Sequence, residues 1–396
     1  MIDRNASTAL RTLAGQYPVV TVTGPRQSGK TTLCRALFPS YPWVNLEPLD
    51  TRVAVQRDPR GFLAQHPDGV IIDEVQHVPD LLSYIQALVD DDGRPGRFIL
   101  TGSQHFGLSE AIAQSLAGRT AVFVLLPPAL DELRRFPDGT ADLLTTLWRG
   151  AYPRIFDRRI EPSRWYADYV TTYVERDVRQ IANVTNLEAF TTFLRLCAGR
   201  SGQELSLNAL GADAGVSQPT ARAWLSVLET SWLCHRLPPW HRNVRKRTIK
   251  APKLHLLDSG LMCFLLGIRS PDQLATHPLR GAVFETWVAA EIHKARANAG
   301  LPVRLSHYRE SRGAEVDVVV DTARAWLLVE AKSGATIASD FFSGLDAIGE
   351  HMSHLEPARA VEKVLVHGGD RTTASRDTHV VSWADVPSFD WTDTIA

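Results

Sequence analysis

Eight residues near the start of the chain have the types and spacing needed to hold a polyphosphate. Residues 24–31 read Gly-Pro-Arg-Gln-Ser-Gly-Lys-Thr. The two glycines let the backbone turn so that successive N–H groups point at phosphate oxygens, and a helix beginning near Lys30 adds the positive end of its dipole. Lys30 can reach the β- and γ-phosphates, and the Thr31 hydroxyl suits Mg²⁺. The predicted nucleotide contacts are Gly24, Pro25, Arg26, Gln27, Ser28, Gly29, Lys30, Thr31 and Thr32.

Two acids further along the chain can complete this chemistry. Asp73 and Glu74 close the apolar run 69–72. An acid at the end of a buried strand can hold Mg²⁺ together with Thr31, and an acid next to it can orient the attacking water as a general base. Two solvated acids are the alternative, but their position after a phosphate-binding loop favours catalysis. We therefore expect a Mg²⁺–ATP site in which Asp73 binds the metal and Glu74 and Lys30 are catalytic.

The elements that must position these residues form an alternating pattern. Short apolar runs are separated by helical patterns, for example at 81–89. Continuous apolar strands that alternate with helices predict a parallel sheet covered on both faces, with ligands at the carboxyl ends of the strands. Ser103 and Gln104 follow the fourth run and could contact the γ-phosphate or the water. The predicted strands are 19–22, 43–46, 69–72, 97–101 and 121–126.

A second set of residues suited to metal chemistry lies near the end of the chain. Asp317 lies on the predicted strand 315–320, and Glu330 and Lys332 end the next predicted strand. Side chains alternate along a strand, so adjacent strands can bring these three together, with Glu285 on a helix packed nearby. Asp317 and Glu330 would bind Mg²⁺, with a further contact from Glu285. Lys332 would activate the water and stabilise phosphate charge. Structural salt bridges are the alternative, although buried acids are costly without a metal.

The middle of the chain has a helix-turn-helix pattern. Two short helices before Gly215 and a longer helix at 221–233 are joined by a turn, in which Ser217 caps the longer helix and Pro219 lies in its first turn. The longer helix would be the recognition helix of a winged-helix-like module. We expect four of its side chains to face outward, namely those of Gln218, Thr220, Arg222 and Trp224.

A basic stretch without acids follows this pattern. On the winged-helix interpretation it is the wing, which would bind the phosphate backbone of DNA or RNA. The alternative is a protein–protein module with a solvated basic loop. Trp240 and His241 lie within the stretch. Its cations are Arg236, Arg242, Arg245, Lys246, Arg247, Lys250 and Lys253.

The composition limits these interpretations. The chain has 396 residues, a formal net charge of -1 and 44% hydrophobic residues, so any nucleic-acid surface must be a local patch on an ordinary globular chain. The four cysteines lack metal-ligand spacing, and no signal peptide or membrane-spanning run is evident, which predicts a cytoplasmic protein with no membrane partner. The predicted domains are 1–157, a helical linker at 158–200 with one long helix at 162–181, then 201–268 and 269–396.

The sequence as a whole resembles the prokaryotic AAA-type P-loop ATPases that carry a C-terminal domain of uncharacterised function. The resemblance rests on GPRQSGKTTL, VIIDEVQ, FILTGSQ and GRTAVFVLLPPALDEL and extends over nearly the entire chain. It implies a Walker A motif at 24–31, a Walker B motif at Asp73 with catalytic Glu74, and a polar sensor after the fourth strand. Arg119 stands where such ATPases have an arginine finger, which would act on a neighbouring subunit and imply a homo-oligomer. A surface ion pair is the alternative for Arg119.

The C-terminal set resembles the PD-(D/E)xK nuclease fold, to which the family's C-terminal domain is similar. The first motif departs from that pattern, because Ala314-Glu315-Val316-Asp317 stands where Pro-Asp is usual. The expected fold is α/β, with a P-loop NTPase parallel sheet, a helical and winged-helix-like segment and a restriction-endonuclease-like α/β domain. ATP would gate nucleic-acid binding or cleavage. The alternatives are a nucleotide-controlled switch with an inactive nuclease-like domain that binds proteins, and a sequence-reading regulator built on the helix-turn-helix.

Overall fold

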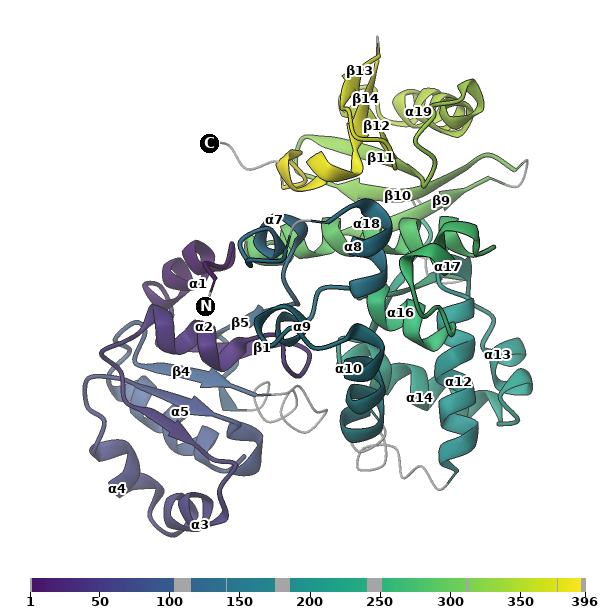
Figure 1. Cartoon of the computed structure of the whole chain (residues 1–396). Helices are drawn as coiled ribbons and strands as arrows, with labels where there is room; N and C mark the ends of the chain where they lie inside the picture. The colour runs from purple at the N-terminus through teal and green to yellow at the C-terminus, as the bar shows by residue number, and fades with distance from the viewer. Residues whose placement is uncertain are drawn as a thin grey trace. The chain divides into compact units, whose positions relative to one another are not determined.

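The computed structural model describes residues 2–102, 115–139, 141–174, 186–240, 251–310, 313–375 and 377–392. The chain forms two compact units (Figure 1). The first consists of Met1–Pro128 with the short pieces Thr230–Trp232 and Ala297–Leu301, and the second contains the remaining residues. Each unit has its own sheets and core, and each is described separately below.

The first unit is built on a five-stranded parallel sheet in the order β2-β3-β4-β1-β5. All four strand pairs are parallel, so the prediction of a parallel sheet is confirmed. The order places β1 between β4 and β5 and brings the carboxyl ends of β1, β3 and β4 to one edge. The strands are β1 (Val19–Thr23), β2 (Trp43–Asn45), β3 (Val70–Asp73), β4 (Phe98–Thr101) and β5 (Thr120–Val124).

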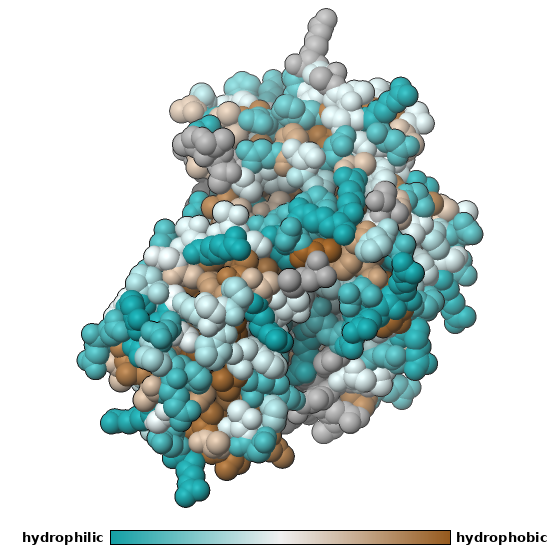
Figure 2. Space-filling model, turned by 60° about the vertical axis from the view of Figure 1, so that its left-hand side comes forward, coloured by the Kyte–Doolittle hydropathy of each residue, from teal (hydrophilic) through white to brown (hydrophobic). Residues whose placement is uncertain are grey.

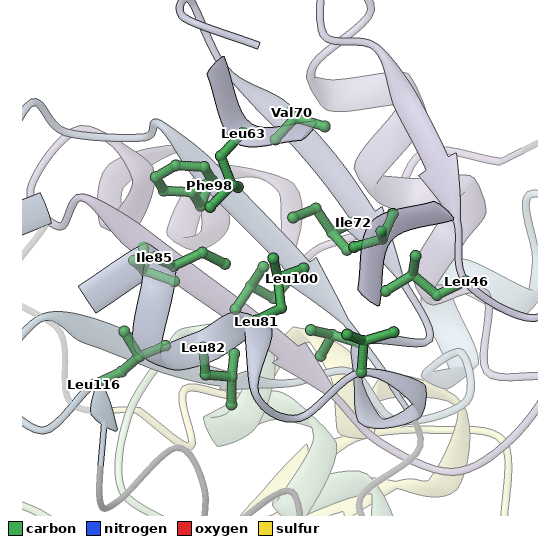
Figure 3. Close-up of a cluster of buried hydrophobic side chains, with 14 of the residues drawn as sticks. Leu46, Leu63, Val70, Ile72, Leu81, Leu82, Ile85, Phe98, Leu100 and Leu116 are labelled. Atoms are coloured by element: carbon green, nitrogen blue, oxygen red, sulfur yellow. The ribbon is translucent and has the colours of Figure 1, made fainter. Parts of the chain in front are cut away.

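Helices cover both faces of this sheet. Successive residues of β3 point to opposite faces: Val70 and Ile72 belong to one hydrophobic cluster, drawn in Figure 3, and Ile71 belongs to another. The cluster of Figure 3 packs the sheet against α4 and α5, and the other packs it against α1 and α2. The helices are α1 (Ser7–Ala14), α2 (Lys30–Leu37), α3 (Leu49–Arg57), α4 (Pro59–Ala64), the 3₁₀ turn η1 (Val75–His77) and α5 (Leu81–Asp91).

The second unit begins with short helices. The prediction of one continuous α-helix at 162–181 is wrong. The α-helix α10 ends at Tyr169, and Val170–Val174 forms the π-helical turn η2. The rest of that prediction lies outside the described residues. The rings of Trp165 and Tyr169 on α10 are stacked, and the ring of Tyr152 is tilted against both. The helices are α7 (Leu130–Leu133), α8 (Leu143–Arg149), α9 (Pro153–Asp157) and α10 (Pro162–Tyr169).

The region predicted as a helix-turn-helix contains the helices α12, α13 and α14 and a small antiparallel sheet in the order β6-β8-β7, and α16 and α17 follow it. The two short helices predicted before Gly215 are one helix, α13. Trp224 was expected to face outward, but it is buried against Phe190 and Phe193 of α12, because a large aromatic ring packs best in the core. The elements are α12 (Leu187–Gly199), β6 (Gln203–Glu204), α13 (Leu207–Asp213), α14 (Gln218–Thr230), β7 (Cys234–Leu237), β8 (Lys253–Leu256), α16 (Ser259–Leu265) and α17 (Pro271–Thr276).

The C-terminal part contains a six-stranded mixed sheet in the order β13-β14-β12-β11-β10-β9. β9, β10 and β11 pair antiparallel, whereas β11, β12 and β14 pair parallel. Trp240, which was expected in an exposed wing, is buried in the core of this sheet beside Trp326 and Tyr308. The elements are α18 (Arg280–Asn298), β9 (Leu305–Arg309), β10 (Glu315–Asp321), β11 (Ala325–Lys332), η3 (Ser339–Phe342), α19 (Ser343–Leu355), β12 (Ala360–His367), β13 (Thr373–Ala374), β14 (Thr378–Ser382) and η4 (Trp383–Ser388).

The surface is mixed in character. On the face in Figure 2, hydrophobic residues occur as separate areas among hydrophilic ones. The large hydrophobic side chains that are exposed include Leu49 and Val53 of α3. Within the part of the chain that the structure describes, no helix is both long and apolar enough to cross a bilayer.

Candidate functional sites

The phosphate-binding loop has the backbone that its glycines predict. Gly24 has φ 138°, and a Cβ atom there would lie 2.2 Å from the carbonyl oxygen of Leu125. Gly29 has φ 97°, and Gln27 between them also has a positive φ, of 63°. The loop follows β1 directly, and α2 begins at Lys30. This conformation lets backbone N–H groups converge on an anion at the helix N-terminus.

Lys30 lies folded back over this loop. Its Nζ donates hydrogen bonds to the carbonyl oxygens of Gly24, at 3.0 Å, and Pro25, at 2.9 Å. Burial lowers the pKa of Lys30 to about 8, although the charges of Glu74 and Asp73 act in the opposite direction. The ammonium therefore has neutral carbonyl partners that phosphate oxygens could replace.

Asp73 and Thr31 are brought together as the sequence predicts. The Thr31 Oγ1 lies 3.1 and 3.0 Å from the two carboxylate oxygens of Asp73 and donates to them. Two residues that sequence reasoning missed also donate to this carboxylate: the hydroxyl of Thr101 at the end of β4, and the indole N–H of Trp43 at 3.4 Å. Thr101 reaches Asp73 because β3 and β4 are neighbours in the sheet, a pairing that no local sequence signal indicates.

Glu74 directly follows β3 in an unusual backbone conformation. Its φ of 57° is left-handed, and a strained backbone of this kind is often kept at functional sites. Its carboxylate accepts a hydrogen bond from the side-chain amide of Gln76. Glu47 and His77 lie close by, with 2.7 Å between His77 Nε2 and Glu47 Oε2, and the three side chains form a group that could hold a metal ion. Sequence reasoning missed Gln76 and His77.

Arg4 holds the loop from the N-terminal side and was also missed. Its guanidinium donates to the carbonyl oxygens of Ser28, at 3.0 Å, and Leu126, at 2.7 Å, and the residue is 8% exposed. A buried, charge-assisted pair of hydrogen bonds of this kind fixes the position of the loop relative to the strand end after β5. No motif in the sequence marks an arginine so far before the loop.

The remaining predicted residues of this site differ in their surroundings. Pro25 and Ser28 are buried, Arg26 and Gln27 are partly buried, and Thr32 is exposed on α2. Arg119 forms a two-point ion pair with Asp90 of the same chain, with nitrogen–oxygen distances of 2.5 and 3.0 Å, which corresponds to the ion-pair interpretation. Ser103 and Gln104 lie outside the described residues.

The C-terminal candidate residues converge at a cavity. Glu285 comes from α18, Asp317 from β10, and Glu330 and Lys332 from β11. Glu285, Asp317 and Lys332 line a cavity of about 340 Å³. Asp317 accepts a hydrogen bond of 2.9 Å from the backbone N–H of Ala331, and Lys332 forms an ion pair with Glu330. The pairing of β10 with β11 thus brings these side chains together, as the strand alternation predicts.

Lys253 is the unexpected member of this cluster. The sequence places it in an exposed basic wing, but that prediction is wrong: it is 3% exposed. Its Nζ lies 2.6 Å from Glu315, 3.1 Å from Glu285 and 3.5 Å from Asp317. Burial by itself would lower the pKa of Lys253, but the three carboxylates outweigh it and the pKa lies above its ordinary value. A buried ammonium needs such partners, which explains why it points inward.

Burial and neighbouring charges also change the pKa of two acids in this cluster. Burial, followed by the negative charge of Asp317, raises the pKa of Glu285 to about 8 and that of Glu330 to about 7.

Of the other predicted wing cations, Arg236 pairs with Glu229. Arg242, Arg245, Lys246, Arg247 and Lys250 lie outside the described residues.

Comparison with known proteins divides the chain into three matched regions. Residues 16–134 match the family model described as an AAA domain. Residues 140–272 and 280–386 match two models described as domains of unknown function, DUF8612 and DUF4143. The first match agrees with the parallel sheet and the phosphate-binding loop, so the N-terminal region is an AAA domain of the P-loop type. The other two matches give no function.

Relatives and one solved structure extend the comparison. The chain is similar to the Walker-type ATPase PABY2304 of Pyrococcus abyssi, with 15% identity, coverage of 67% of this chain and 96% of that one, and a TM-score of 0.45. The uncharacterized proteins Rv2008c of Mycobacterium tuberculosis and Mb2031c of Mycobacterium bovis are each 34% identical over 325 residues, which is 80% of this chain and 71% of theirs. On that similarity, the chain belongs to the same family as these two mycobacterial proteins, and it carries an AAA domain at its N-terminus.

Proposed function

We propose that the chain is a Mg²⁺-dependent ATPase. The observation that carries this proposal is the convergence of Lys30, Thr31 and Asp73 at the carboxyl edge of the parallel sheet. The Thr31 hydroxyl and the Asp73 carboxylate are hard oxygen donors, which is the kind of ligand that Mg²⁺ prefers. When bound, the metal would neutralise charge on the β- and γ-phosphates.

The protein's own groups account for the remaining steps. The loop N–H groups and Lys30 would bind the phosphates after Lys30 leaves its carbonyl partners. Glu74 would accept the proton of the attacking water, with Gln76 orienting its carboxylate. In a homo-oligomer, Arg119 of one copy would leave Asp90 and stabilise charge at a neighbouring copy's site.

Substitution of Glu74 tests this proposal. Glu74→Gln keeps the shape of the side chain but removes the base, so ATP hydrolysis should fall at least about a hundredfold while ATP binding persists. Phosphate release and binding of a fluorescent ATP analogue measure the two effects. Asp80→Asn, which changes an exposed acid just before α5 that makes no capping hydrogen bond, is the matched control. Hydrolysis by Glu74→Gln at the wild-type rate would rule out Glu74 as the base.

A second candidate function is metal-dependent cleavage of nucleic acid by the C-terminal domain. The observation in its favour is that Glu285, Asp317 and Lys332 line one cavity and Glu330 lies beside them. The order of helices and strands in residues 187–256 supports a winged-helix-like module that could bind DNA or RNA. ATP would then gate binding or cleavage.

Nicking of supercoiled DNA with Mn²⁺ separates this candidate from its alternative. Nuclease action predicts nicking that Lys332→Ala abolishes, because Lys332 would activate the water. The alternative is a nucleotide-controlled switch whose C-terminal domain binds a protein partner without cutting. It is supported by Lys253, which already compensates part of the acidic charge. That alternative predicts no nicking of DNA or RNA, and an ATP-dependent change in assembly that Lys332→Ala leaves intact.

A further inference from the structure

The carboxylate cluster of the C-terminal domain contains more acids than ammonium groups. Its acids are Glu285, Glu315, Asp317 and Glu330, and its two ammonium groups are those of Lys253 and Lys332. Arg309 also lies 3.8 Å from Glu315, but it is half exposed and is shared with Glu204. Two of the acids therefore have no ammonium partner of their own, and full ionisation of all four is costly at buried positions without a further cation.

The oxygen atoms of the cluster divide into two groups. The Lys253 ammonium forms ion pairs with one carboxylate oxygen each of Glu285, Glu315 and Asp317. The other Asp317 oxygen accepts the Ala331 N–H. By contrast, Glu330 Oε2 is buried and has no hydrogen-bond partner among the described residues, and Glu330 as a whole is 9% exposed. A buried carboxylate oxygen without a donor marks a position that a cation would satisfy.

The cavity borders acids of the cluster but not Lys253. The described residues that form the cavity wall include Asp317, Ala331 and Lys332 but not Lys253. The side chain of Lys253 is only 4% exposed, so it is enclosed by the protein. An ion entering from the cavity would therefore meet Glu285 and Asp317, which line its wall, with Glu330 next to the wall residue Ala331.

From these observations we propose that the Lys253 ammonium takes the place of one cation in this cluster and leaves room for one divalent cation at Asp317 and Glu330. Mg²⁺ and Mn²⁺ bind through one or two carboxylates with water in the remaining positions, so two acids suffice. Lys253 begins β8, whereas its partners lie on α18 and β10. The winged-helix-like segment at 201–268, to which β8 belongs, thus supplies the positive charge that sets how many metal ions the C-terminal site holds. The inference rests on the metal-binding function proposed above for this domain.

Counting bound Mn²⁺ by electron paramagnetic resonance tests this inference. The experiment uses the full chain without nucleotide and with Asp73→Asn and Glu74→Gln, so that neither the Thr31–Asp73 site nor the Glu47–Glu74–His77 group contributes. This parent should bind one Mn²⁺ per chain, and Glu330→Gln added to it should bind none. Lys253→Met added to the parent should bind two, because the position held by the ammonium becomes free.

Control variants distinguish a variant that does not fold from a wrong role for Lys253 and from the absence of the metal site. Lys363→Met, which removes a lysine paired with the exposed Asp346 and Asp377, should leave the count at one. If circular dichroism shows that Lys253→Met does not fold, Lys253→Met with Glu315→Gln keeps the cluster charge constant and should also bind two ions. A count that stays at one in the folded Lys253 variant overturns the role of Lys253 alone. A count of zero in the parent overturns the metal site as well, while leaving the ATPase proposal untouched.

Discussion

Lys30 in the phosphate-binding loop and Lys253 in the C-terminal cluster are both buried, yet their partners differ in kind. Lys30 donates to two neutral backbone carbonyl groups, whereas Lys253 is surrounded by three carboxylates. A hydrogen bond to a neutral group contributes only about 1 kcal/mol, so phosphate oxygens can replace it readily. An ammonium among buried carboxylates is far harder to remove. The first site is therefore prepared for an anion, and the second for cations.

The largest effect on ATP binding that would break this comparison is expected at Gly24. In Gly24→Ala the new Cβ would lie 2.2 Å from the Leu125 carbonyl oxygen at a φ of 138°, so the loop must move away from β5. A shift of this size in a site that depends on exact placement should weaken ATP binding about a hundredfold. Titration with a fluorescent ATP analogue measures the loss.

The matched control for Gly24 is Gly267→Ala. Gly267 also has a positive φ, of 77°, but no atom lies within 4 Å of a Cβ placed there. This variant should carry backbone strain of about 1 kcal/mol and bind ATP normally. Equal ATP affinity in the two variants would show that the Leu125 contact does not set the shape of the loop.

The largest effect on stability is expected at Lys253. Lys253→Met leaves three carboxylates without their shared cation and should lower the free energy of unfolding by about 3–5 kcal/mol. Lys363→Met, which removes a more superficial lysine from two exposed acids, should lower it by about 1 kcal/mol or less. Denaturant unfolding followed by circular dichroism compares them. Similar losses would mean that burial does not distinguish the two lysines.

The two regions also differ in how far the sequence could predict them. The phosphate-binding loop is contiguous, so Gly24 to Thr31 could be identified directly, and Asp73 followed from the end of a neighbouring apolar run. Arg4 and Thr101 could not be found, because they reach the site only through the packing of α1 and the pairing of β3 with β4.

In the C-terminal region the spacing of Asp317, Glu330 and Lys332 predicted a cluster, because alternation along two adjacent strands is a local property. The role of Lys253 could not be predicted in this way. Counting charges in the basic stretch placed it on the surface, since nothing in its neighbours shows that the chain turns it towards acids more than thirty residues away. The predictions that Trp224 and Trp240 are exposed were wrong for a related reason. Both aromatic rings are buried by tertiary packing, which helix and loop patterns do not contain.

The smallest effect concerns the proton on Lys30 and sharpens the contrast between the lysines. Burial lowers the pKa of Lys30 to about 8, so without nucleotide the ammonium loses its proton above that pH, and its attraction for phosphate declines. ATP affinity should then fall by up to about tenfold for each pH unit above 8. Lys30→Arg carries a guanidinium that stays charged, so its affinity, although weaker, should be flat over the same range. The effect on stability has the opposite sign: the unfolded chain binds more protons than the folded chain between pH 8 and 10.5, so Lys30 makes stability rise with pH there. Wild-type affinity that stays constant from pH 7 to about 9.5 would mean that the buried lysine keeps its proton, and that its neutral carbonyl partners suffice to hold the charge.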